Sequence, residues 1–274
     1  MSGFSASDAA LEGFQVLGRQ WRVVVGWGVF NLLAIVAMIV VAVILGVGIG
    51  LADGVDKASS AAGVIGAVVG VLVTGLIETV LIVAVYRLML RPADPGFLHL
   101  RIGRDEGRLF VVGLVLVLGV VAFASFAYFL IGALGFLGVA GHVAGALVVL
   151  AVGGWLALRL GLAAPISFAE QKIDFARSWR MTRGQVWPLL GMWVLNVCLV
   201  MLVWLALWLA MFLLSGLLTG FHGFGPAEGG EALQAHPGRY LLEAIVPVVC
   251  MPVLLVLSQA PWVAAYRALS TPPT

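Results

Sequence analysis

Charged side chains are scarce in this sequence of 274 residues. It holds 15 Lys and Arg and 13 Asp and Glu residues, which is 10% of the chain, whereas about 25% is usual in soluble domains. Hydrophobic residues make up 62%, and the mean hydropathy is +1.13. So few charges cannot cover the surface of a soluble globule of this size. The composition therefore excludes a soluble domain and predicts an integral membrane protein.

Cysteines and catalytic motifs are scarce as well. Cys198 and Cys250 both lie in apolar stretches, which argues against a disulfide scaffold or a cysteine-based metal site. The sequence has no HExxH, GxSxG, Walker or CxxC motif and no paired nucleophile and base. We therefore expect no enzyme, catalytic residue, cofactor or bound metal, and an intramembrane enzyme is the weakest of three functional hypotheses. One outer loop contains groups that can ligate metals, but its Gly- and Pro-rich surroundings favour a solvated loop: His222, Glu228, Glu231 and His236.

Six stretches are long and apolar enough to cross a membrane, which takes about 20 residues in a helix. They are apolar on all sides and do not alternate with period two, so they do not fit the strands of a β-barrel. We therefore predict an all-α fold, a polytopic membrane helix bundle with six transmembrane helices. The expected spans are Val23 to Ile49, Val64 to Met89, Leu109 to Ile131, His142 to Leu162, Leu189 to Leu218, and Leu241 to Ala264.

The distribution of Lys and Arg over the connecting loops predicts the orientation. Thirteen of the 15 lie on the side of the two termini and two on the opposite side. Because positive residues accumulate in cytoplasmic loops, both termini are expected in the cytoplasm. Arg greatly outnumbers Lys in an Ala-, Gly- and Val-rich chain, which is typical of bacteria with GC-rich genomes. The predicted location is thus a bacterial inner membrane.

The spans form three hairpins, each preceded by a basic amphipathic stretch. The returning helices end on Arg87, Arg159 and Arg267. We predict one membrane domain over residues 1–274. Its expected parts are an interfacial helix at 1–22, hairpin 1 at 23–89, a cytoplasmic interfacial segment at 91–108, hairpin 2 at 109–162, a cytoplasmic interfacial helix at 165–187, and hairpin 3 at 189–267.

The hairpins resemble an internal repeat. Asn31 and Asn196 stand at the same offset in the first and third units, whereas the middle unit has Leu118 there. Parallel repeats occur in transporters. However, any protein built of hairpins also needs interfacial anchors and basic cytoplasmic ends. Duplication and shared architectural need both remain open as explanations.

The interfacial segments are expected to lie at the headgroups. Ser5 to Asp8 and Ser167 to Glu170 resemble the starts of helices with a capping box. The basic residues either anchor the chain and set its topology, or they recognise an anionic lipid or the acidic tail of a partner. The candidate contacts with headgroups or a partner are Arg19, Arg22, Arg101, Arg104, Arg108, Arg177, Arg180 and Arg183.

Two neighbouring segments carry a resemblance to a known group. They read Arg159-Leu-Gly-Leu-Ala-Ala-Pro165 and Ser178-Trp-Arg-Met-Thr182-Arg-Gly184-Gln-Val-Trp187. Together with the six-span layout, they resemble bacterial membrane proteins of the YciC-like group, which includes the membrane domain attached to some glycerophosphoryl diester phosphodiesterases. The resemblance implies a six-helix membrane fold. It implies no catalytic residues, because the phosphodiesterase activity belongs to a separate soluble barrel domain that this sequence does not contain.

An acidic residue, Glu78, lies deep in the second expected span. Asn31, Asn196 and Gln259 fall at a similar depth, roughly 13 Å from the cytoplasmic end at 1.5 Å per residue, and form with it a predicted intramembrane polar layer. An isolated carboxylate in lipid is costly, so Glu78 should be protonated or face the bundle interior near amides or Arg159. Interhelical hydrogen bonding and a proton-, ion- or substrate-linked site are both open roles.

Glycine pairs spaced four residues apart allow helix backbones to approach closely. They are expected to pack within the monomer, and a dimer interface is the alternative. The pairs are Gly46 and Gly50, Gly66 and Gly70, and Gly141 and Gly145.

These observations favour a non-enzymatic accessory, assembly or regulatory component that interacts with membrane lipids or another membrane protein. The alternative is a small transporter or channel that uses the polar layer around Glu78. Nothing in the sequence indicates a nucleic acid as partner.

Overall fold

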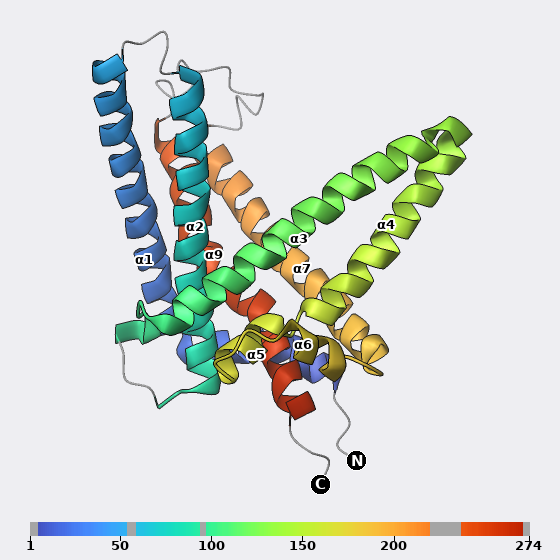
Figure 1. Ribbon diagram of the computed structural model, residues 1–274. Coiled ribbons are helices and arrows are strands. Elements are labelled where there is room, and N and C mark those ends of the chain that lie inside the picture. The colour runs from blue at the N-terminus through green and yellow to red at the C-terminus, as the bar shows by residue number, and fades with distance from the viewer. Residues whose placement is uncertain (1–4, 54–58, 94–96, 220–236, 271–274) are drawn as a thin grey trace. The chain divides into compact units, whose positions relative to one another are not determined.

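The computed structural model describes residues 5–53, 59–93, 97–219 and 237–270. Regular structure in these ranges is helical throughout (Figure 1). The four loop residues considered for metal binding, between His222 and His236, lie outside them. The long helices are α1 (Ala6–Asp53), α2 (Ser59–Leu90), α3 (Arg104–Leu134), α4 (Val139–Leu160), α7 (Val186–Thr219) and α9 (Pro237–Ser270). The short ones are η1 (Phe97–His99), η2 (Gly135–Leu137), α5 (Ala163–Ala169) and α6 (Phe175–Met181).

The predicted fold class is confirmed, because six helices in the described part of the chain are long and apolar enough to cross a membrane. Large apolar side chains such as Val120, Leu150 and Leu217 are exposed along them, as expected where the surroundings are lipid. The protein is an all-α, multi-pass membrane protein. The candidate spans are Ala6–Ile44, Ile65–Leu90, Arg104–Leu137, Val139–Ala169, Val186–Leu217 and Leu241–Ser270.

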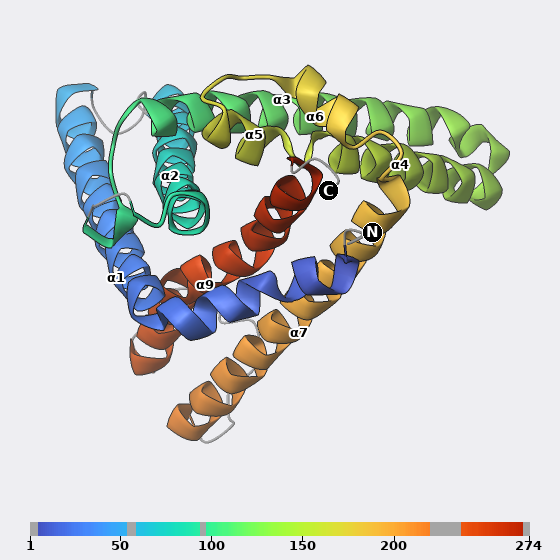
Figure 2. The same cartoon turned by 90° about the horizontal axis from the view of Figure 1, so that it is seen from below.

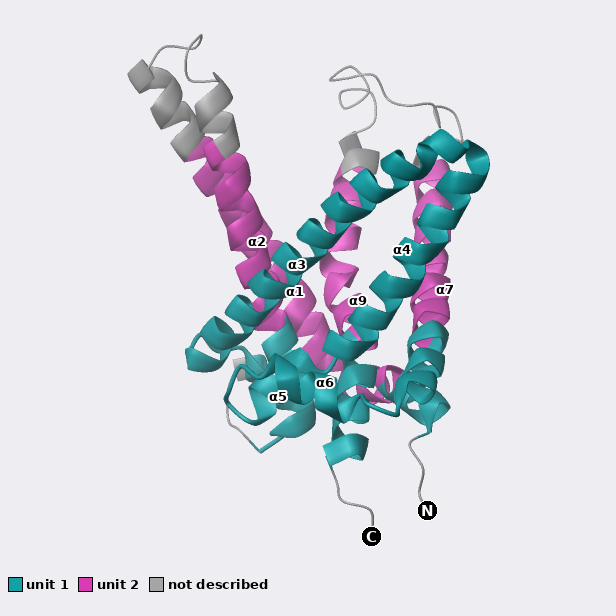
Figure 3. Cartoon of the chain, turned by 45° about the vertical axis from the view of Figure 1, so that its right-hand side comes forward, with its two compact units in different colours: residues 1–12, 82–195, 259–274 teal, residues 13–81, 196–258 magenta. Residues whose placement is uncertain are grey.

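The chain divides into two compact units, each built from separate parts of the sequence (Figure 3). Unit 1 comprises residues 1–12, 82–195 and 259–274. Unit 2 comprises residues 13–81 and 196–258.

The start of α1 follows the predicted capping pattern. The backbone N–H of Asp8 donates to Ser5 Oγ at 3.4 Å, so the hydroxyl satisfies an N–H that has no partner within the helix. Gln20 departs from helical geometry, with φ −124° and ψ 28°. The resulting kink separates the first turns of α1 from its apolar part, two residues before the boundary that the sequence predicts at residue 22.

In unit 2, α1 packs directly on α9. A Cβ atom on Gly28 would lie 2.6 Å from the carbonyl oxygen of Val249, so only glycine allows the two backbones this close. One turn along, Asn31 Nδ2 donates to the carbonyl oxygen of Val248 at 2.7 Å. Farther along, α1 also meets α2, where the Thr74 hydroxyl lies 3.6 Å from the Met38 sulfur.

In unit 1, α3 packs against α4 and α5, while α6 packs against α4 and α5 (Figure 2). The structure has two short helices where one interfacial helix was expected at 165–187, and Gln171 lies between them at φ 58°. The predicted helix start at Ser167 is wrong, because Ser167 is buried inside α5 and Glu170 ends that helix. The N-cap in this region is Asp174, whose carboxylate accepts from the backbone N–H of Arg177 at 2.8 Å.

The glycine pairs differ in their surroundings. A Cβ on Gly145 would lie 3.2 Å from side-chain atoms of Ile131 and Leu134, and one on Gly141 would clash with the Leu134 carbonyl. This pair therefore packs within the α3–α4 hairpin. No described atom outside α2 lies within 4 Å of a Cβ built on Gly66 or Gly70. The surroundings of Gly46 and Gly50 fall outside the described part of the chain.

Candidate functional site

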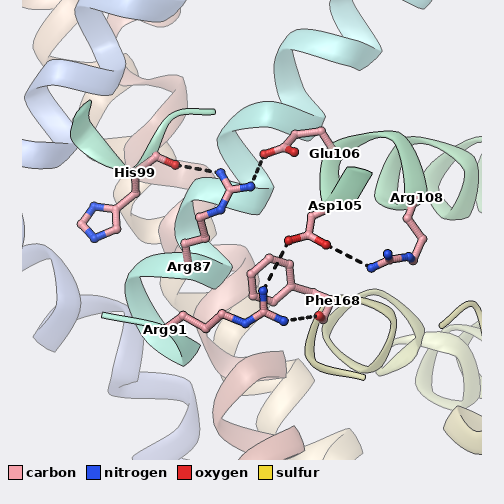
Figure 4. Close-up of polar contacts among 7 residues, drawn as sticks. All are labelled: Arg87, Arg91, His99, Asp105, Glu106, Arg108 and Phe168. Carbon is pink, nitrogen blue, oxygen red and sulfur yellow. Dashed lines mark hydrogen bonds and ion pairs between the residues drawn. The ribbon is translucent and has the colours of Figure 1, made fainter. Parts of the chain in front are cut away.

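A buried ion pair joins α2 to α3 in unit 1. An Arg87 Nη atom lies 2.5 Å from Glu106 Oε1, and the side chains are only 6% and 1% exposed (Figure 4). The other Arg87 Nη donates to the carbonyl oxygen of His99 at 3.0 Å. Glu106 stands in the first turn of α3, where the helix dipole stabilises negative charge. Its second oxygen, Oε2, is buried with no hydrogen-bond partner among the described residues.

Arg91 extends this ion-pair cluster toward α5. Its guanidinium lies 3.4 Å from an Asp105 oxygen and donates to the carbonyl oxygen of Phe168 at 3.2 Å. The same group stacks 4.6 Å from the centre of the Phe168 ring, and the other Asp105 oxygen pairs with Arg108 at 3.1 Å. We call Arg87, Arg91, Asp105, Glu106 and Arg108 the α2–α3 ion-pair cluster.

Arg159, at the end of α4, holds the α6 region. It donates to the carbonyl oxygen of Trp179 at 3.3 Å and to the Thr182 hydroxyl at 3.4 Å. Its guanidinium lies 5.5 Å from the Trp155 ring centre and 5.4 Å from that of Trp179, within the range of cation–π attraction. The Ser178 hydroxyl donates to the Arg159 carbonyl at 2.7 Å. The two segments that carry the family resemblance therefore contact each other.

Arg267 makes a comparable contact at the end of α9, where an Nη atom lies 3.7 Å from Glu12 Oε1. Arg87, Arg159 and Arg267 thus share one role in unit 1. Each lies near the end of a returning helix. Arg87 and Arg159 contact the segment that precedes the next hairpin, and Arg267 contacts the segment that precedes the first hairpin. The sequence shows these arginines, whereas their partners lie 12 to 255 positions away along the chain and become visible only in the structure.

The residues of the predicted polar layer do not form a connected network within unit 2. Asn31 and Asn196 are buried, and Glu78 is half-buried. No hydrogen bond or ion pair joins these three side chains in the part of unit 2 that the structure describes. In unit 1, Gln259 accepts from the Tyr86 hydroxyl at 2.8 Å, and Arg159 has the partners given above.

The basic residues predicted to contact headgroups fall into two sets. Arg108, Arg177 and Arg180 pair with acidic side chains: Arg177 lies 2.6 Å from Glu170, and Arg180 lies 3.9 Å from Asp174. The others are exposed and have no ion pair among the described residues: Arg19, Arg22, Arg101, Arg104 and Arg183.

Each basic segment also exposes a large apolar side chain beside its unpaired arginines. Trp21 is 57% exposed next to Arg22, whose guanidinium lies 5.5 Å from the Trp21 ring centre. Ile102 is 82% exposed between Arg101 and Arg104. Trp187, four residues after Arg183, is also 82% exposed. Adjacent cationic and apolar side chains are typical of a surface at the membrane interface.

Unit 2 contains a groove of about 480 Å³ between α7 and α9 that the sequence analysis missed. At one end the Ser215 hydroxyl lies 3.3 Å from Glu243 Oε1. Because α7 is apolar on all sides, its sequence gives no sign of which face is hollowed. Glu78 is not among the residues lining this groove, which are Trp204, Leu207, Trp208, Met211, Phe212, Ser215, Glu243, Val246, Pro247, Cys250, Met251 and Leu254.

Comparison of the chain with protein-family models, curated proteins and solved structures gave no match. The described residues contain no group of three His, Cys, Asp or Glu side chains placed to hold a metal ion.

Proposed function

We propose that the chain is a non-enzymatic, integral inner-membrane protein that acts as an accessory, assembly or regulatory component. In this proposal its three basic segments, 1–22, 91–108 and 165–187, rest on anionic lipid headgroups of the cytoplasmic leaflet. The observation that carries the proposal is the exposed apolar side chain beside unpaired arginines in every segment. An apolar side chain at the acyl boundary holds the segment in place while the guanidiniums pair with phosphates.

The buried polar groups of unit 1 support a structural rather than a chemical role for that unit. Arg87 and Glu106 neutralise each other, and the Arg159 guanidinium lies close to the rings of both Trp155 and Trp179. These groups are engaged in holding helices together. The resemblance of residues 159–187 to the YciC-like group agrees with a six-helix membrane protein.

Lipid composition around the purified protein tests the proposal. The full chain is placed in nanodiscs of phosphatidylcholine with phosphatidylglycerol, and co-purifying lipids are counted by mass spectrometry after gentle detergent extraction. Each arginine near an anionic surface contributes about 1 kcal/mol. The variant Arg101→Gln/Arg104→Gln should therefore lose most of a severalfold enrichment of phosphatidylglycerol that the wild type shows.

The matched control is Arg177→Gln/Arg180→Gln, which removes the same charge from arginines that already pair with Glu170 and Asp174. It should change the enrichment much less. Equal lipid composition around the wild type and the Arg101/Arg104 variant would contradict the proposal.

A transporter or channel is a second candidate, favoured by one observation. Glu78 is a half-buried carboxyl group in α2 with no hydrogen bond or ion pair in the described part of the chain, and ionisable groups in spans often serve transport. Proteoliposomes with an entrapped pH indicator test this candidate. Proton flux through the wild type that Glu78→Gln abolishes would support it, while absence of flux under a potential would exclude proton transport.

A further inference from the structure

Arg159 differs from the other two arginines that lie near the ends of returning helices in unit 1. The Arg87 guanidinium lies 2.5 Å from the Glu106 carboxylate. An Arg267 Nη atom lies 3.7 Å from the Glu12 carboxylate. Arg159 forms no ion pair in the part of the chain that the structure describes, and it donates only to a neutral carbonyl and a neutral hydroxyl. Its positive charge therefore has no counter-ion among the described residues.

One edge of the Arg159 guanidinium is also unused as a hydrogen-bond donor. The group has five N–H donors, and its bonds to the Trp179 carbonyl and the Thr182 hydroxyl both come from Nη1. Nε is buried without a partner among the described residues, while Nη2 donates to none of them and is not buried. Nε and Nη2 share one edge of the planar group, and such an edge donates two parallel hydrogen bonds to a phosphate or a carboxylate. The unused edge therefore suits an oxyanion.

The charges around this edge favour a bound anion. Arg183 directly follows Thr182, whose hydroxyl accepts from Arg159, and it is exposed without an ion pair among the described residues. The acids of the same segment, Glu170 and Asp174, already pair with other arginines. An anion at Arg159 is therefore attracted by two positive charges that no described carboxylate neutralises.

The level of Arg159 in the membrane indicates the source of the anion. Arg159 is the last residue but one of α4, which belongs to a candidate span. The rings of Trp155 and Trp179 lie 4.9 Å apart beside it and are 41% and 38% exposed. Tryptophans at the end of a span are typical of the headgroup level, where the phosphodiesters of phospholipids lie. A membrane lipid is thus the oxyanion in reach.

We propose that Arg159 binds the phosphodiester of one anionic phospholipid, which supplies the counter-ion that Glu106 and Glu12 supply to the other two arginines. This site rests on the proposed contact of the basic segments with the cytoplasmic leaflet, and it adds one discrete position to that contact. Phosphatidylglycerol should be preferred to phosphatidylcholine, because Arg159 and Arg183 repel the choline ammonium. The contribution of one arginine at an anionic surface corresponds to about a fivefold preference.

A carboxylate placed beside Arg159 tests the site without removing the bonds that Arg159 makes to the α6 region. Residue 155 lies one helical turn before Arg159, and Glu four residues before Arg forms an ion pair on a helix. Trp155→Glu therefore supplies the missing counter-ion from within the chain. The matched control, Trp155→Gln, has nearly the same shape as Trp155→Glu and no charge. Binding of the first phosphatidylglycerol to the full chain in detergent micelles is titrated by native mass spectrometry, with phosphatidylcholine as the reference lipid.

The charge at position 155 should decide the outcome. The wild type should prefer phosphatidylglycerol by about fivefold, Trp155→Gln should keep this preference, and Trp155→Glu should lose it. If Arg159 served only to hold the α6 region, the two variants would behave alike. Equal preference in Trp155→Glu and Trp155→Gln, or no preference in the wild type, would overturn the proposal. Thermal midpoints of both variants verify that they are folded.

Two further arms separate this site from the basic segments and from soluble ligands. Arg101→Gln/Arg104→Gln should leave the first binding step unchanged. A first step that depends on these two arginines and not on the charge at position 155 would refute the site alone and leave the proposed function standing. Glycerophosphoglycerol, the same headgroup without acyl chains, should not displace the bound lipid at equal concentration, whereas displacement would overturn a lipid as the ligand.

Discussion

Replacing Glu106 by Gln should destabilise the protein strongly, although the change alters few atoms. The exposures of 6% and 1% show that the Arg87–Glu106 pair is nearly sealed from solvent. In Glu106→Gln the guanidinium keeps the His99 carbonyl as acceptor but loses its counter-charge. Leaving one charge of a buried pair uncompensated costs about 3–5 kcal/mol. The free energy of unfolding, measured by titration with SDS in mixed micelles, should fall by this amount.

Two further variants test whether the loss of stability in Glu106→Gln comes from the uncompensated charge of Arg87. Arg177→Gln breaks a pair of similar length whose side chains are 45% and 25% exposed, and it should cost at most about 1 kcal/mol. The double variant Arg87→Met/Glu106→Leu removes both charges and should recover most of the lost stability, since apolar replacement of a buried pair is often neutral. A loss in Glu106→Gln no larger than that in Arg177→Gln would refute the reasoning.

Two further predictions use the same unfolding assay. Gly28→Ala places a Cβ against the Val249 carbonyl and should destabilise the protein by about 1–3 kcal/mol. In the control Gly18→Ala the new Cβ meets open space, and the higher helix propensity of Ala should stabilise the protein by about 0.5–1 kcal/mol. Equal effects of the two substitutions would contradict the close approach of α1 and α9. Arg159→Lys should lose about 1–2 kcal/mol, because an ammonium cannot lie flat against the indole rings and donate to the Trp179 carbonyl as a planar guanidinium does. A loss below about 0.5 kcal/mol would show that the contact with the rings contributes little.

The span count could be predicted from the sequence because it depends only on the length and hydropathy of each stretch. The kink at Gln20 also follows a visible change, from a segment with charged residues to an apolar one. The break within 165–187 was missed because Ser167 and Glu170 imitate a helix start. In the structure, burial of Ser167 and the positive φ of Gln171 place that start at Asp174 instead.

The functional residues were only partly visible in the sequence. Basic segments are local features, so the exposed arginines could be listed from the sequence. Glu106 could not be recognised as buried, because its partner Arg87 lies 19 positions earlier. The sequence alone does not distinguish Glu106 from the neighbouring charged residues that are exposed. The sequence offers one signal for this pair: Arg87 lies in the last turn of one helix, and Glu106 lies in the first turn of the next long helix. The groove could not be predicted, because α7 and α9 are apolar on all sides and their sequences do not indicate which face is hollowed.

The most direct test of the proposed function is the side of the membrane on which the three basic segments lie. Single-cysteine variants Gln15→Cys, Ile102→Cys and Lys172→Cys report on the segments, and Phe136→Cys, exposed in the turn between α3 and α4, reports on the opposite side. Each is made without the two native cysteines and treated with a membrane-impermeant maleimide in intact spheroplasts. We predict labelling of Phe136→Cys alone, with the other three labelled only after permeabilisation. Labelling of any of those three in intact spheroplasts would contradict a shared cytoplasmic surface.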